Sequence, residues 1–484
     1  MKIVNFGANV SFDPKHFYEP RSEEEVLDIL NKHKDGKIRV VGSLHAWSDC
    51  VVSEDVIVDL RYINSVEVTK DKNNGQVWAT VGGGCVLQDM LDAIRRKAGS
   101  NVAIPTLGGL KRQTIAGAIS TGTHGSGKSS LSHFMKELRM AAYDPKTGKA
   151  KIYNYKEGSE LQAARCSLGC MGIIVSVKFR LVPQYWIREK LERYKNLQDL
   201  MAKRKDYPLQ QFTLFPYLWE YFSFQRQVTS QKPSAMAGFA YFLARWYDYF
   251  SVEILSHIML SFLIRLFPSE KGSSKTIQWF YKRFIPRFIS QPSVVNESTT
   301  GLTLHTAHHY YFRHLEMEIF ILPNDLAKAV KVIRAITSVF AEEQNEIPEE
   351  VTSELKRIGA YDELISFKGI YTHHYPFFFR YVEPDDTLIS MTSDGNARYS
   401  ISFFTYLSHE KNKYFYKFAD FSARTLMKLY GARLHWGKYF PLINKEIENL
   451  YPQLEKFRFI CNKVDPKGVF RNDYTRRTLG LKIQ

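Results

Sequence analysis

One histidine, His45, stands in a turn made of small and polar residues. The turn follows three β-formers, Ile38, Val40 and Val41, and residues 40–50 read VVGSLHAWSDC. Backbone N–H groups in such a turn can converge on a phosphate, because glycine permits close approach and conformations that other residues avoid. The pattern predicts a strand that ends in an anion-binding loop. The alternative is an ordinary turn with a surface histidine, since small polar turns commonly follow strands.

A second stretch, residues 105–127, is rich in glycine and hydroxyl side chains. It reads PTLGGLKRQTIAGAISTGTHGSG. So many glycines would weaken an ordinary core element, whereas they suit close backbone contact with a large polar ligand that carries phosphates. The spacing matches neither the P-loop pattern GxxxxGK[ST] nor the GxGxxG of Rossmann folds. The ligand must therefore be held in another way.

These two stretches, together with SLGCMGIIVSVKFRLVP at residues 167–183, resemble the FAD-binding domain of vanillyl-alcohol-oxidase-type flavoproteins. Toward the C-terminus, RHLEMEIFILP (313–323), LHWGKYF (434–440) and VDPKGVFRNDYTRR (464–477) resemble the sugar-1,4-lactone oxidase branch, which includes gulonolactone, D-arabinono-1,4-lactone and alditol oxidases. The resemblance covers most of the chain in the family's order. It implies an α+β fold, with a two-subdomain FAD-binding domain and an α+β cap domain that contains an antiparallel sheet.

The elements that must position these residues can be followed along the chain. Residues 1–185 alternate helical and strand-like patterns, and we expect them to form the FAD-binding domain. Residues 186–430 are the expected cap or substrate domain, in which helices cover an antiparallel sheet. This domain carries an aromatic-rich helical insert at about 235–292. Residues 431–484 are expected to return to the FAD-binding domain, as the resemblance implies.

The resemblance also implies where FAD contacts the chain. His45 stands where the family's histidine is bonded to the 8-methyl carbon of the flavin, a bond that raises the flavin potential and fixes the cofactor. Some members lack this bond, and His45 is then a plain loop residue. The expected FAD contacts are Val41, Gly42, Ser43, Leu44, His45, Ser48, Gly108, Gly109, Thr114, Gly117, Ser120, Thr121, Gly122, Thr123, His124, Gly125, Gly127, Gly169, Gly172, Ile174 and Lys438. Gly108 matches a gate position where a small residue lets dioxygen reach the reduced flavin, which favours an oxidase.

Two cations are the expected catalytic residues. Lys438 in HWGK matches the family's lysine at the reactive edge of the flavin, where a positive charge would stabilise the charge that develops as hydride arrives. The alternative for it is a solvated lysine. Arg380 in PFFFRYV matches an arginine that holds substrate or flavin. The chain departs from the sugar branch nearby, because Phe378 replaces a glutamate and Phe403 replaces a histidine, whereas Thr405 matches.

The activity implied is hydride transfer from a CH–OH carbon to flavin N5, with dioxygen or another compound as the final electron acceptor. A sugar 1,4-lactone or related polyol is the first substrate class. The two departures remove groups that could take the hydroxyl proton and add aromatic rings, so a lipid-linked sugar or other hydrophobic alcohol is the alternative. Decaprenylphosphoryl-ribose oxidase acts on such a substrate, but it lacks the bonded histidine. A third hypothesis is a flavin-binding interaction protein without turnover.

Composition narrows the class of protein and its partners. The 484 residues are 44% hydrophobic and 24% charged, which suits a globular protein with two or three cores. A net charge of +16 raises the question of nucleic acid, yet the basic residues are dispersed and no nucleic-acid-binding motif is present. An anionic membrane surface is the better partner for this charge. The five cysteines lack the spacing of a metal site, so we expect reduced thiols and no bound metal.

Location follows from the N-terminus and the insert. The first residues show no secretory signal, so we expect a cytoplasmic protein, with peripheral membrane contact as an option. Charged residues at 245, 248, 253 and 265 interrupt the apolar run of the insert below the roughly 20 residues that a membrane span needs. Two interpretations remain for the insert. It is either a buried hairpin under the cap or an amphipathic element on a membrane surface.

Overall fold

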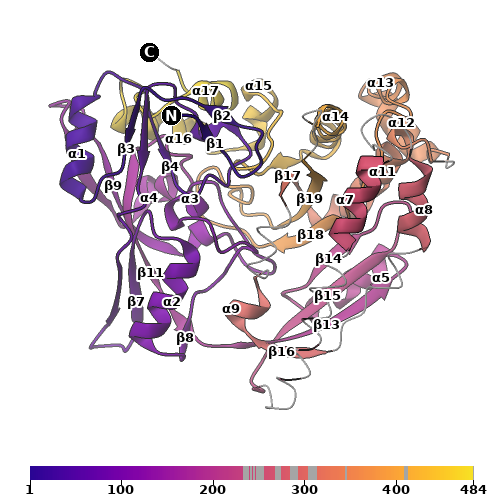
Figure 1. Cartoon of the computed structure of the whole chain (residues 1–484), viewed down its shortest axis with the longest axis horizontal. Coiled ribbons are helices and arrows are strands. Elements are labelled where there is room, and N and C mark those ends of the chain that lie inside the picture. The colour runs from indigo at the N-terminus through magenta and orange to yellow at the C-terminus, as the bar shows by residue number, and fades with distance from the viewer. Residues whose placement is uncertain are drawn as a thin grey trace.

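The computed structural model describes residues 1–232, 239, 243, 246, 256–266, 274–283, 293–303, 313–343, 346–407 and 412–482. Figure 1 shows two lobes side by side, an N-terminal lobe and a cap lobe, with the C-terminal helices packed on the N-terminal lobe. Most of the predicted insert lies outside the described residues, and only α7 (Ser256–Leu266), α8 (Lys275–Arg283) and four single positions of it, 239, 243, 246 and 274, are described.

The N-terminal lobe contains two main sheets. The parallel sheet has the order β3 (His16–Tyr18), β5 (Val56–Asp59), β4 (Ile38–Val41). The antiparallel sheet has the order β10 (Ala150–Tyr155), β9 (Met135–Tyr143), β11 (Ile173–Arg180), β7 (Val77–Gly82), β6 (Val66–Lys70). Two short pairs, β1 (Ile3–Val4) with β2 (Ser11–Phe12) and β8 (Val102–Ala103) with β12 (Val182–Pro183), complete the strands of this lobe. The helices are α1 (Glu23–Lys32), α2 (Leu87–Ala98), α3 (Ile115–Ser120) and α4 (Gly158–Arg165).

Strand β4 ends where the sequence predicted, and the loop that follows is tightly constrained. A Cβ at Gly42 would lie 2.2 Å from the Thr114 hydroxyl, so only glycine lets the loop approach the start of α3 this closely. Leu44 takes a left-handed conformation with φ +54°, which L-residues rarely adopt. Thr114 caps α3 by accepting a hydrogen bond from the Gly117 amide. The two sequence motifs therefore meet at Gly42 and Thr114.

The cap lobe is organised around one eight-stranded sheet in which neighbouring strands are antiparallel, which confirms the expected antiparallel sheet. The order is β16 (Val294–Glu297), β13 (Trp186–Tyr194), β15 (Tyr221–Thr229), β14 (Gln211–Leu214), β18 (Phe377–Val382), β19 (Arg398–Tyr406), β17 (His314–Ile321), β20 (Arg433–Leu434). The other described helices of this lobe are α5 (Leu197–Ala202), α9 (Ser298–Gly301), α11 (Leu326–Phe340), α12 (Glu349–Arg357), α13 (Tyr361–Ser366) and α14 (Lys413–Tyr430). Helix α14 contacts both α11 and β17.

Strand β17 separates the core of the cap from the junction between the lobes. All eight of its residues are buried. Because side chains alternate along a strand, Met317 and Ile319 face one side of the sheet and Glu316 and Glu318 face the other. The charged face is directed toward the N-terminal lobe, where Glu318 meets His124.

The C-terminal segment begins in the cap sheet at β20 and is then hydrogen-bonded to the N-terminal lobe. After β20 it forms α15 (Asn444–Ile447), α16 (Leu454–Val464) and α17 (Asp473–Leu479). The Trp47 amide donates to the Gly437 carbonyl at 2.8 Å, and the Ser48 hydroxyl donates to the Trp436 carbonyl at 2.8 Å. The His45 loop and the HWGK segment are therefore fixed to one another by direct hydrogen bonds.

The five cysteines are free and buried, as expected for reduced thiols. Among the described helices, none combines the length and the apolar character that crossing a bilayer requires.

Candidate active site

A cavity lies where the His45 loop, the glycine-rich stretch and the HWGK segment meet. Thirteen of the predicted FAD contacts line it: Val41, Gly42, Ser43, Leu44, His45, Thr114, Gly117, Ser120, Thr121, Gly169, Gly172, Ile174 and Lys438. The structure thus brings together motifs that are separated by up to about 400 residues in the chain.

The other predicted contacts lie beside the cavity and do not line it. They are Ser48, Gly108, Gly109, Gly122, Thr123, His124, Gly125 and Gly127. Several of these glycines allow close packing of the chain on itself: a Cβ at Gly127 would lie 2.0 Å from the Pro208 carbonyl oxygen, and one at Gly125 would lie 2.5 Å from that of Leu107. A Cβ at Gly108 would lie 2.7 Å from the Thr123 methyl group, so its role as a dioxygen gate stays a prediction.

The chemistry of the lining fits a dinucleotide that carries a diphosphate. Among the described residues of the lining, none is acidic, whereas Arg39 and Lys438 are basic. Arg39 is buried and donates hydrogen bonds to the backbone carbonyls of Phe470, Cys50 and Leu168 beneath the cavity. Main-chain N–H groups of a glycine-rich loop and a fixed guanidinium both stabilise anionic ligands.

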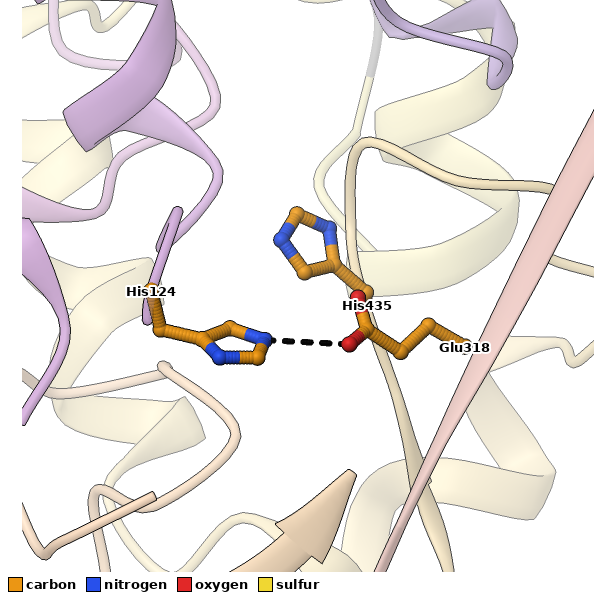
Figure 2. A group of neighbouring side chains, drawn as sticks. All are labelled: His124, Glu318 and His435. Carbon is orange, nitrogen blue, oxygen red and sulfur yellow. Dashed lines mark ion pairs between the residues drawn. The ribbon is translucent and has the colours of Figure 1, made fainter. Parts of the chain in front are cut away.

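One end of the cavity meets a buried cluster of His124, Glu318 and His435, which come from three separate segments (Figure 2). His124 Nε2 lies 3.2 Å from Glu318 Oε1, and both side chains are 2% exposed. Arg380 Nη1 lies 3.6 Å from the same oxygen. Lys438 pairs with Glu316 on the same face of β17 and lies over the Trp47 ring.

The hydrogen bonds of the two imidazoles define where their protons lie. His124 Nδ1 lies 2.9 Å from the Gly125 carbonyl, which can only accept, so Nδ1 carries a proton and Nε2 is the ring nitrogen that faces Glu318. His435 Nδ1 accepts from the Gly437 amide at 3.1 Å. Burial lowers the pKa of His435 to about 3, so this ring is neutral with its proton on Nε2. It is therefore a hydrogen-bond donor that lines the cavity.

The two glutamates of β17 differ in their charge environment. Burial acts to raise the pKa of both carboxyls. At Glu318 the attraction of His124 and its hydrogen bond, together with the charge of Arg380, outweigh burial and hold the pKa well below its usual range. At Glu316 burial outweighs the attraction of Lys438, and the pKa is raised. Glu318 is thus a carboxylate that His124 and Arg380 hold in place.

The same cluster has the composition of a metal site, because its ligand atoms lie within 4.8 Å of one another. Its surroundings do not favour a cation. The guanidinium of Arg380 already faces the carboxylate of Glu318. The ammonium of Lys438 pairs with Glu316, two residues away on the same face of β17. Both ring Nδ1 atoms are also used by the backbone. The arrangement suits proton transfer better than metal binding.

The strand register corrects one sequence interpretation. Phe403 packs into the cap core, with its ring 4.9 Å from Phe377 and 5.9 Å from Phe418, and so cannot replace an active-site histidine. The prediction was wrong because a shift of one residue moves a side chain to the opposite sheet face. The ring that faces the junction is Phe404, which pairs with Glu316 across the strands. Phe378 lies on this face, two residues before Arg380.

Sequence reasoning missed Glu318 and His435. Both supply the kinds of group, a carboxylate and an imidazole, that the replacements at Phe378 and Phe403 were expected to remove. A signal for Glu318 was present, since EMEIFI places two glutamates on one face of an otherwise apolar strand. His435 stands three residues before Lys438, in the same motif. The presence of these groups weakens the hypothesis of a flavin-binding protein without turnover.

Comparison with known proteins agrees with this site. A family model described as D-arabinono-1,4-lactone oxidase matches residues 177–478, and an FAD binding domain model matches residues 14–146. The chain belongs to the D-arabinono-1,4-lactone oxidase family. It is an FAD-dependent oxidoreductase that acts on CH–OH groups, and the residues of the cavity fit this cofactor.

Relatives in sequence, and solved structures with a similar fold, cover nearly the whole chain. A long-chain alcohol oxidase from an uncultured marine euryarchaeote is 37% identical over 476 residues, which span 98% of this chain and 96% of the relative. L-gulonolactone oxidase of Mus musculus is 24% identical over 491 residues, 99% of this chain and 98% of the relative. The crystal structure of cholesterol oxidase from B. sterolicum has a TM-score of 0.71 at 15% identity, covers 99% of this chain and 96% of its own, and shows the shared fold.

Proposed function

We propose that this member of the family oxidises a hydrophobic, long-chain alcohol to the corresponding carbonyl compound, with dioxygen reduced to hydrogen peroxide. The observation that carries the proposal is a largely buried aromatic cluster on the sheet face that also bears Glu316 and Arg380. Phe378 and Phe404 lie 5.4 Å apart, and Tyr375 contacts both rings. A polyol needs hydrogen-bonding partners along its length, whereas an alkyl chain is stabilised by such rings.

The similarity to the long-chain alcohol oxidase supports the same substrate class. This chain is 37% identical to the long-chain alcohol oxidase and 24% identical to L-gulonolactone oxidase. The replacement of the sugar branch's glutamate by Phe378 agrees with that order. A sugar 1,4-lactone or related polyol is the second candidate, because the lactone oxidase model matches most of the cap and the C-terminal segment.

We assign the chain's residues the following roles. FAD, when bound, supplies the two-electron acceptor for the hydrogen on the alcohol carbon. The carboxylate of Glu318, held by His124 and Arg380, accepts the hydroxyl proton. Its low pKa is no obstacle, because the hydroxyl becomes that of a protonated carbonyl, a strong acid, as the hydride leaves. The His435 Nε2–H donates a hydrogen bond to the substrate oxygen and orients it.

The positive charge of Lys438 stabilises the negative charge that accumulates at this end of the cavity. Its ammonium is fixed between Glu316 and the Trp47 ring, so little reorganisation is needed. We also propose that His45 is bonded to the cofactor. It lines the cavity, and its ring stacks with that of Phe6 at 5.2 Å.

The test is oxygen consumption by the purified holoenzyme with primary alcohols of increasing chain length, sugar lactones and alditols. We expect hydrogen peroxide in equal amount to the oxygen consumed, and kcat/KM that rises with chain length. Turnover of lactones alone would support the second candidate. For His45, flavin absorbance should stay with acid-precipitated protein and be released in His45→Ala.

A further inference from the structure

We infer that the outward faces of α7 and α8 dock the protein on the surface of an anionic lipid bilayer. Helix α7 is apolar on two opposite faces. Leu260 is buried, whereas Ile258, Phe262 and Leu266 are 60%, 59% and 56% exposed. These three recur every fourth residue and so form one stripe. A helix on the surface of a globular protein normally carries polar residues along such a stripe.

Helix α8 extends the exposed apolar surface. It buries Ile277, Phe280 and Tyr281 and presents Trp279, which is 59% exposed. The two helices contact each other, and Figure 1 places them beside α11 at the end of the molecule far from α1. Tryptophan is enriched at membrane interfaces, where its ring spans the boundary between apolar chains and polar headgroups.

This clustering is specific to the insert. Of the fourteen large apolar side chains that are exposed in the described part of the chain, seven lie between residues 239 and 279. The other seven are distributed from residue 1 to residue 459. Single exposed apolar residues are normal, but a concentrated group of this kind marks an interaction surface.

Charge selects the partner. Neither α7 nor α8 contains an acidic residue, and α8 presents Lys275, Lys282 and Arg283 at the surface. Lys282 also pairs with Glu343 of the cap, so Lys275 and Arg283 are the principal cations of this face. The whole chain carries a net charge of +16. Exposed apolar rings flanked by basic residues match the interface of an anionic bilayer.

Docking would bring the enzyme to its substrate, because a long-chain alcohol partitions into membranes. This biological role rests on the proposed function. The docking itself rests only on the exposed apolar and basic residues of α7 and α8. The test is therefore vesicle binding without substrate. The holoenzyme is sedimented with phosphatidylcholine vesicles that contain phosphatidylglycerol, and with vesicles of phosphatidylcholine alone. The variant is Phe262→Ser/Trp279→Ser, and the matched control is Phe459→Ser, since Phe459 on α16 is 70% exposed.

We expect the wild type and the control to sediment with the anionic vesicles, and the double variant to lose binding by at least about tenfold while its flavin content is unchanged. Activity toward an alcohol dispersed in detergent should be equal in all three, so failure of the proposed function would show as inactivity and not as loss of vesicle binding. The inference is overturned if the wild type does not sediment with the anionic vesicles, or if the double variant sediments with them as well as the control does. A wild type that self-associates through this surface, and becomes monomeric only in the double variant, would also overturn it.

Discussion

The cavity and the Glu318 cluster adjoin each other, yet they are built in different ways. The cavity is formed by local loops. Glycine lets the main chain of one loop pack closely against another segment, as Gly42 does against Thr114. The cluster is formed by side chains of three segments, and the register of β17 and β19 decides which of them meet. In the proposed function, the first region fixes the cofactor class and the second decides which alcohol is oxidised. The predictions below separate the two.

The largest effect is expected from Glu318→Gln. The amide keeps the shape of the side chain but cannot accept the hydroxyl proton, so kcat/KM for the alcohol should fall by roughly 10³-fold. Flavin content should be unchanged, because Glu318 does not line the cavity. Glu137→Gln, on β9 of the N-terminal lobe, is the matched control and should leave kcat/KM unaltered. Loss of flavin in Glu318→Gln would contradict the separation of the two regions.

Phe378→Glu should change the substrate and leave the cofactor in place. A carboxylate beside Arg380 is poorly compatible with an alkyl chain, so kcat/KM for long-chain alcohols should fall by roughly 10- to 100-fold. Turnover of alditols or lactones should rise. Phe378→Leu keeps the surface apolar and should retain the dependence on chain length. Equal chain-length dependence in the glutamate variant would show that these rings do not contact the substrate.

Gly42→Ala should act on the cofactor alone. Its Cβ would meet the Thr114 hydroxyl at 2.2 Å and push the His45 loop out of place, so we expect FAD affinity to fall by roughly tenfold or more. The comparison is Gly148→Ala, in the turn between β9 and β10: its φ of +67° makes an alanine locally strained, but a Cβ there meets nothing within 4 Å and the turn is outside the cavity. That variant should keep its full ratio of flavin to protein absorbance.

The smallest effect concerns acid stability on the cap side. Burial lowers the pKa of His435 and of His374 from 6.5 to about 3. Between these values the unfolded chain binds protons that the folded protein does not, so stability is lost as the pH falls from 6.5 toward 3. Each histidine contributes about 1.4 kcal/mol per pH unit. His374→Gln should reduce the pH dependence of the unfolding free energy by that amount, measured by denaturant titration.

The sequence indicated the segments that line the cavity but not the side chains that meet in the cluster, for a physical reason. The loop from Gly42 to His45 and the stretch around Thr114 are each continuous in sequence. Their glycines indicate that the backbone packs closely against a neighbouring segment or a ligand. Glu318 and His435 stand more than a hundred residues apart and meet only because β17 pairs with β20 beside the HWGK turn. The placement of Phe403 failed at the same step, since alternation along a strand does not reveal which of two faces meets the other lobe.

The most direct test of the central claim is anaerobic reduction of the bound flavin. The holoenzyme is mixed without oxygen with dodecan-1-ol, with butan-1-ol or with D-arabinono-1,4-lactone, and the loss of flavin absorbance is followed in a stopped-flow instrument. We predict rapid bleaching by the long alcohol, slower bleaching by the short one and little by the lactone, with Glu318→Gln slow toward all three. Rapid bleaching by the lactone and none by the alcohols would contradict the account.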